Sequence, residues 1–262
     1  MQPNSKYLTN VGTIKEYNDS YYKLTQLFIS RNHGFESERK FVAKGGAGNE
    51  EKLDNSISRT KATVFEISIC NPWEYFVTFT LNKDKHDRYD LKDYIKRLGY
   101  FLQNYNRNHQ VSIDYILIPE KHKDGAWHMH GFFMGIPITH LQAFKLDMSL
   151  PRDIRERLKM GKTVYNWETY QRSFGWCCIE QIENPEAVSK YITKYITKDL
   201  SRSVTDLNAK MYYCTKNLKR STIVYRDFLA RSIDCPDYSN DYVSAKVCST
   251  YEEAYAYFTQ GG

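Results

Sequence analysis

The sequence has no run of about 18 apolar residues, the length that a membrane-spanning helix requires. Its first six residues, MQPNSK, also lack the apolar core of a secretory signal. The first absence argues against a helical membrane protein, and the second argues against export. We therefore expect a cytoplasmic protein that has no membrane partner.

Two common motifs are also missing. The six cysteines include no CxxC pair, so neither a zinc ribbon nor a thioredoxin-like redox motif is indicated, and buried or incidental thiols are expected. The phosphate-binding pattern GxxxxGK[ST] does not occur either. An NTP-driven helicase domain is therefore not encoded in this sequence.

Aromatic residues, by contrast, are abundant: they make up 15% of the chain and include 22 tyrosines. The formal net charge of +6 favours an anionic partner. Aromatic rings can stack on unpaired bases, and basic side chains can hold phosphates. The combination favours nucleic acid as the partner.

The distribution of glycine and of hydrophobic period predicts one core with an extension at each end. The stretch at residues 44–51 is glycine-rich and predicts a flexible loop, while residues 1–60 show little period. A chain of 262 residues can form one substantial core. We expect an N-terminal extension at 1–61, a core domain at 62–200, and a C-terminal extension at 201–262 that packs on the core.

Within the core, the period changes between that of strands and that of helices. From Asp90 onwards apolar residues recur at three- and four-residue steps, which predicts an amphipathic helix with Asp90 as its N-cap. Asn184 and Pro185 predict the start of another helix. Strands are predicted at residues 64–69, 75–81, 113–119, 127–134 and 176–182, with a mostly helical segment at 139–161. Beyond the core, residues 222–225 predict a strand and residues 250–258 a short helix.

This order predicts an α+β fold. The antiparallel β-sheet would follow the ferredoxin-like or RRM-like β-α-β-β-α-β plan, with helices covering one face. The helix that starts at Asn184 is an addition to this plan at the C-terminal end of the core.

Two histidines lie one residue apart in the predicted strand at 127–134. Side chains alternate between the faces of a strand, so His128 and His130 are expected to point the same way. Glu120, eight residues before His128, could supply a third metal ligand. His122 would share the face of Glu120 if the strand continues that far, but a carboxylate suits a hard ion better.

The last predicted helix of the core contains the duplicated sequence YITKYITK. Tyr191 and Tyr195 are four residues apart and would share a helix face. Phenols are weak nucleophiles near pH 7 because their pKa is about 10, so attack by one requires nearby positive charge or a base. A neighbouring row of lysines could supply that charge and hold phosphates, namely Lys190, Lys194 and Lys198.

Each of these patterns also has an ordinary structural explanation. An isolated HxH pair is commonly two polar residues on a wet sheet face. The tyrosines flank an apolar stripe of the same helix and could serve packing, and a lysine row is often a solvated face. Thr78 and Thr80 in the strand at 75–81 are expected to be sheet residues without a chemical task. The patterns become specific only in combination and in this order.

In this combination the chain resembles the HUH endonucleases, in the two-tyrosine class of rolling-circle replication initiators of small circular phages and plasmids. Three motifs carry the resemblance in order: FVTFTL at residues 76–81, His128-Met129-His130, and YITKYITK with its two tyrosines. The motifs fall within residues 64–200 and leave both ends of the chain outside the resemblance.

The resemblance implies a nickase that cuts one strand of DNA at a replication origin and stays attached to the 5′ phosphate through tyrosine. It implies Mg²⁺ or Mn²⁺ held by His128, His130 and Glu120, with His122 as the alternative third ligand. The phenols of Tyr191 and Tyr195 would attack with Lys194 beside them, and Lys190 and Lys198 would contact DNA. A host helicase and polymerase in a bacterial cytoplasm would complete replication.

Other functions fit parts of the pattern. A conjugative relaxase or a single-strand transposase would use the same chemistry on another target DNA. Two histidines and a carboxylate could instead hold Fe(II) in an oxygenase, which would require a jelly-roll barrel. A non-catalytic single-strand DNA-binding protein would use the aromatic rings for stacking alone.

Overall fold

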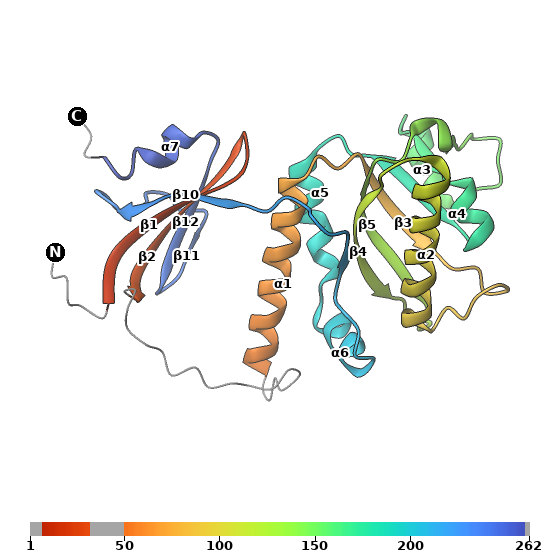
Figure 1. Cartoon of the computed structure of the whole chain (residues 1–262), viewed down its shortest axis with the longest axis horizontal. Helices are drawn as coiled ribbons and strands as arrows, with labels where there is room; N and C mark the ends of the chain where they lie inside the picture. The colour runs from red at the N-terminus through yellow and green to blue at the C-terminus, as the bar shows by residue number, and fades with distance from the viewer. Residues whose placement is uncertain (1–6, 32–49, 260–262) are drawn as a thin grey trace. The chain divides into compact units, whose positions relative to one another are not determined.

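The computed structural model describes residues 7–31 and 50–259 and divides the chain into two compact units, shown in Figure 1. The terminal unit combines the two ends of the chain, residues 1–46 and 219–262. The central unit consists of residues 47–218. We describe each unit by itself.

The terminal unit contains a five-stranded antiparallel sheet with the order β10-β1-β2-β12-β11. Ile14 and Leu24 on the two N-terminal strands are buried together with Cys248 and Tyr257 from the C-terminal segment. The elements are β1 (Tyr7–Asn18), β2 (Tyr21–Arg31), β10 (Thr222–Phe228), β11 (Tyr238–Ser239), β12 (Val243–Cys248) and the helix α7 (Tyr251–Tyr255). The expected strand at 222–225 and helix near 250–258 are confirmed.

The two N-terminal strands were not predicted. Irregular pairing after Ile14 and near Glu16 interrupts their alternation, which hides the strand period in the sequence. The sheet also depends on partners from the other end of the chain, since β1 pairs with β10 and β2 with β12.

The unit boundaries differ from the expected divisions after residues 61 and 200. Helix α1 (Glu50–Cys70) packs against α5 (Pro185–Ile192) and α6 (Lys198–Asp206), which places all three in the central unit. Strand β9 (Tyr213–Cys214) pairs with β4 (Asp114–Lys121) of the same unit. Packing of the C-terminal extension on the core stays a prediction.

The central unit has a seven-stranded antiparallel sheet with the order β6-β7-β8-β3-β5-β4-β9. Its middle strands are four of those predicted, and the α+β fold is confirmed. Strands β3 (Tyr75–Thr80), β4, β5 (Trp127–Met134) and β8 (Cys177–Gln181) form this middle, and β6 (Gln142–Ala143) and β7 (Val164–Asn166) continue one edge.

Two segments differ from their predicted structure. Residues 64–69 belong to α1, because buried Ile57, Val64 and Ile67 lie at helical spacing and face a core; their β-branched composition had indicated a strand. In the segment 139–161, the α-helix is limited to α3 (Arg152–Lys159), which begins after Pro151 at its N-cap. Proline disfavours helical conformation in the residue before it, and β6 pairs with β7 upstream.

The predicted helix starts are confirmed. Asp90 caps α2 (Leu91–His109) by accepting a hydrogen bond from the Asp93 amide at 3.0 Å. Asn184 caps α5 by accepting one from the Ala187 amide at 3.0 Å. Neither these nor the other described helices are long and apolar enough to cross a lipid bilayer.

Helices cover both faces of the central sheet rather than one, as Figure 1 shows. Phe79 of β3 stacks on Tyr170 of α4 (Glu168–Ser173), whose hydroxyl bonds to that of Tyr94 on α2. Phe76 of the same strand points the other way and contacts Tyr191 of α5. The second face, which carries Phe76, is the one that holds the predicted site.

Gly131, between the site strands, permits close approach of their backbones. A Cβ atom there would lie 1.9 Å from the carbonyl oxygen of Ile116 on β4, whereas one at Gly99 of α2 meets nothing within 4 Å. We expect Gly131→Ala to lower the free energy of unfolding by about 1–3 kcal/mol through overpacking. Gly99→Ala should raise it by about 0.5–1 kcal/mol. Urea unfolding would measure both, and equal midpoints would contradict the close approach.

Candidate functional site

The register of three neighbouring strands places the predicted histidines and carboxylate on one sheet face. In the β3–β5 ladder Thr78 lies opposite His130 and Thr80 lies opposite His128. In the β4–β5 ladder Glu120 lies opposite His128. Because paired residues project to the same side, these five side chains share one face.

Glu120 joins two imidazoles into a compact cluster. Its Oε2 lies 2.7 Å from Nε2 of His130 and 3.5 Å from Nε2 of His122. One ligand atom from each of the three residues lies within 4.8 Å of the others. Two imidazoles and a carboxylate suit a borderline or hard divalent ion, so this cluster could hold a metal.

The cluster contains His122, the alternative ligand, and leaves His128 at its side. Strand β4 ends at Lys121, and the turn that follows, closed by the His122 amide on the Ala126 carbonyl at 2.9 Å, places the His122 ring on that of His128. Their centroids are 3.6 Å apart and their planes differ by 8°. Burial first, and then the nearby His122 and His130, lower the pKa of His128 to about 4.

Thr78 and Thr80 contact the histidines directly, which the sequence analysis missed. The Oγ1 of Thr78 lies 3.1 Å from Nδ1 of His130, and the Oγ1 of Thr80 lies 3.2 Å from Nδ1 of His128. When Nδ1 donates its proton to a hydroxyl, Nε2 carries the lone pair that binds a metal. The alternation of β3 put both threonines on one face, but only the register with β5 identifies their partners.

This arrangement predicts an effect on metal affinity. We expect Thr78→Val to weaken Mn²⁺ binding about 10- to 100-fold, because an oriented ligand loses the hydrogen bond that fixes its ring. Thr78→Ser keeps a hydroxyl at this position and should restore most of the affinity. Titration calorimetry would measure both variants, and unchanged affinity in Thr78→Val would show that the hydroxyl does not orient His130.

The two tyrosines come together without a continuous helix. Helix α5 ends at Ile192, a 3-10 turn spans Thr193–Tyr195, and α6 begins at Lys198. The expected uninterrupted helix through YITKYITK is therefore wrong in its second half. The Tyr195 hydroxyl nevertheless donates to the Tyr191 hydroxyl at 3.3 Å, because the 3-10 turn keeps the phenols on neighbouring turns.

The phenol pair lies against the histidine cluster. The ring of Tyr195 stacks on that of His130, with centroids 4.2 Å apart and planes within 6°. The ring of Tyr191 meets the edge of Phe76 at 5.8 Å between centroids. The tyrosines and the possible metal ligands are thus on the same side of the sheet and in contact.

Lys194 gives the phenol pair its positive charge. Its Nζ lies 3.3 Å from the ring centroid of Tyr191 and 5.0 Å from that of Tyr195. Burial alone would raise the pKa of Tyr191, but hydrogen bonds with Lys194 and Tyr195 outweigh it and leave the pKa below its usual value. Burial, followed by the hydrogen bond with Tyr191, raises the pKa of Tyr195.

The other two lysines of the predicted row contact carboxylates of the chain. Lys190 Nζ lies 2.6 Å from Glu186, and Lys198 Nζ lies 2.9 Å from Asp54. Both pairs are exposed, and such pairs are weak enough to exchange their partner. A role of Lys190 and Lys198 in DNA binding stays a prediction.

Comparison with known proteins agrees with this part of the chain. Residues 74–200, which lie within the central unit, match the model of a family described as Replication-associated protein, of the ORF2 type. No curated protein and no solved structure matches the chain. The family match supports a Rep-type replication initiator that interacts with DNA.

Proposed function

We propose that the protein initiates rolling-circle replication by metal-dependent, site-specific nicking and rejoining of single-stranded DNA. The observation that carries the proposal is the contact between the phenol pair and the imidazole–carboxylate cluster, with Tyr195 stacked on His130. A scissile phosphate placed there would meet both a nucleophile and a site for a divalent ion. The family match over the same residues supports replication over a relaxase or a transposase.

The cluster of Glu120, His122 and His130, with His128 stacked at its side, would hold Mg²⁺ or Mn²⁺. A bound divalent ion polarises a non-bridging phosphate oxygen and so stabilises the transferring phosphoryl group. The cluster lies where the phenols can use this, because His130 contacts Tyr195 directly.

In the cleavage step, a phenolic oxygen forms a bond to phosphorus and the P–O3′ bond breaks. The phenol gives up its proton and the 3′ oxygen gains one, which leaves a 5′-phosphotyrosine and a free 3′ hydroxyl. Lys194 favours the phenolate by its charge, and the second phenol, 3.3 Å away, is placed to attack in the next transfer. The linkage conserves the phosphodiester bond for rejoining.

The partners follow from this activity. The substrate is single-stranded DNA at an origin, and strand separation requires a helicase that this sequence does not encode. We propose that the host supplies the helicase and the polymerase. The oxygenase alternative loses its structural requirement, since the cluster lies on a helix-covered open sheet and not in a jelly-roll barrel.

The test is formation of a covalent adduct. The full chain is incubated with Mn²⁺ and a panel of single-stranded oligonucleotides from its replicon, and the products are separated under denaturing conditions. We expect one oligonucleotide class to give a denaturant-resistant protein–DNA adduct that EDTA prevents. Binding without an adduct would identify a non-catalytic single-strand DNA-binding protein and refute the nickase.

A further inference from the structure

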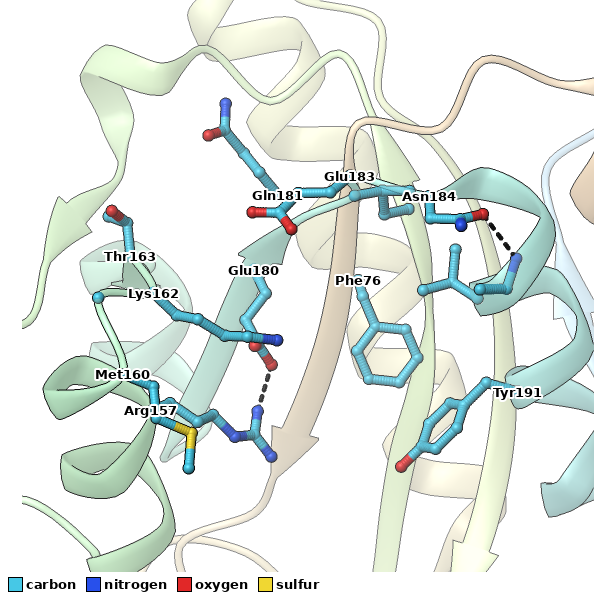
Figure 2. Close-up of a pocket in the computed structure, with 14 residues that line it drawn as sticks. Phe76, Arg157, Met160, Lys162, Thr163, Glu180, Gln181, Glu183, Asn184 and Tyr191 are labelled. Carbon is cyan, nitrogen blue, oxygen red and sulfur yellow. Dashed lines mark hydrogen bonds and ion pairs between the residues drawn. The ribbon is translucent and has the colours of Figure 1, made fainter.

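A cavity of about 750 Å³ opens beside Tyr191 on the same face of the central sheet. Figure 2 shows its construction: Phe76 and Glu180 of β3 and β8 form the floor, Arg157 of α3 lies on one side, and Tyr191 of α5 on the other. The volume is within the range of about 300–1,000 Å³ that is typical of small-ligand sites. It is large enough for one unpaired nucleotide and too small for a base-paired duplex.

The floor and one rim of this cavity offer apolar surface. Phe76 is partly exposed towards it, and the Met160 side chain at its rim is 79% exposed. Val188 of α5 adds an aliphatic surface on the side of Tyr191. Base faces bind to aromatic and apolar side chains with little dependence on sequence.

The remaining walls carry hydrogen-bonding and cationic groups. Lys162 forms no ion pair with the residues that the structure describes, and its side chain projects towards Glu180 in Figure 2. Glu180 is already paired with Arg157. Gln181 adds a side-chain amide, which can donate to and accept from the edge of a base. The cavity therefore combines an apolar floor, a cation and an amide, as a nucleotide requires.

We propose that this cavity binds one unpaired nucleotide of the DNA strand next to the scissile phosphate. The base would lie against Phe76 and Met160, with its edge near Gln181 and its phosphate near Lys162. The cavity adjoins Tyr191, so a nucleotide held there fixes the position of the neighbouring linkage relative to the phenols. This inference rests on the proposed function and adds the base-contacting part of its substrate site.

The first test scans the strand with a single abasic nucleotide. The probe is the panel oligonucleotide that the full chain binds most tightly, and anisotropy is measured in EDTA so that no cleavage occurs. We expect loss of one base, at a position next to the cleaved linkage, to weaken binding about 5- to 100-fold, and other positions to have smaller effects. Lys162→Ala combined with Gln181→Ala should remove this difference between positions.

Lys159→Ala is the matched control, because Lys159 is an exposed lysine of the same helix region that does not line the cavity. It should retain the effect of position. An abasic scan without a preferred position, an unchanged preference in the double variant, or a failure of every oligonucleotide to bind would overturn the proposal.

A second test uses the wild-type protein and therefore does not depend on the folding of a variant. Iodouracil is placed at the preferred position, irradiated, and the crosslinked peptide is identified. A crosslink to Phe76 or to residues 157–163 supports the proposal, and crosslinks confined to other segments overturn it. An adduct without this crosslink would leave the nickase standing and remove the cavity; the crosslink without an adduct would do the reverse.

Discussion

His130→Ala is expected to lower the rate of adduct formation by about 1,000-fold or more. His130 contacts Glu120 at 2.7 Å and stacks on Tyr195, so its loss affects both the possible metal site and the phenol beside it. A bound metal contributes several kcal/mol to phosphoryl transfer, and about 4 kcal/mol corresponds to this factor. Single-turnover assays in Mn²⁺ would measure the rate.

DNA affinity should remain within a few-fold in the same variant, because the cluster acts on the transition state more than on binding. His109→Ala, an exposed histidine at the end of α2, is the control and should not change the rate. An unchanged adduct yield in His130→Ala would refute the metal-dependent mechanism.

The same assay separates the roles of the two stacked histidines. His122 contributes a ligand atom to the cluster, whereas His128 lies against the His122 ring and bonds to Thr80. The sequence pattern predicts that His128→Ala abolishes the adduct, and loss of the stacking partner of His122 leads to the same expectation. Mn²⁺ titrations of His122→Ala and His128→Ala would identify which ring contributes more to metal affinity.

The double change Tyr191→Phe with Tyr195→Phe is expected to eliminate the adduct altogether. No phenolic oxygen would remain at the cluster, while both rings, and the stacking of residue 195 on His130, would be kept. Each single variant should still form an adduct through the other hydroxyl, which lies 3.3 Å away, but should not pass the strand on in a second transfer. Denaturing gels after one and several turnovers would distinguish the two steps.

Tyr100→Phe serves as the control for this pair, since Tyr100 is 58% exposed on α2. It should leave both steps unchanged. An adduct at the wild-type level in the double variant would show that another side chain attacks the DNA.

Local sequence determined the elements whose signals are contained within them. The alternation of residues 75–81, the caps Asp90 and Asn184, and the helical spacing after Asp90 are all short-range features, and each gave the observed element. The same rules failed at residues 64–69, where β-branched side chains lie in a helix stabilised by contacts with α5. Tertiary packing overrides propensity there.

The terminal sheet could not be predicted for another reason. Val11 on β1 pairs with Phe228 on β10, so the partner of the first strand lies near the other end of the chain. A single sequence does not reveal which distant strands pair, and the irregular register around Ile14 removes the local period as well. Residues 1–60 therefore gave no strand signal of their own.

The sequence by itself determined that His128 and His130 project to one face and that Tyr191 and Tyr195 return to similar positions, because both follow from the period of a strand and of a helical turn. Only the tertiary structure decided that His122 joins Glu120 and His130, that Thr78 and Thr80 bond to the imidazoles, and that Tyr195 stacks on His130. These contacts depend on strand register and on the course of a turn, which long-range pairing sets and local residue order does not.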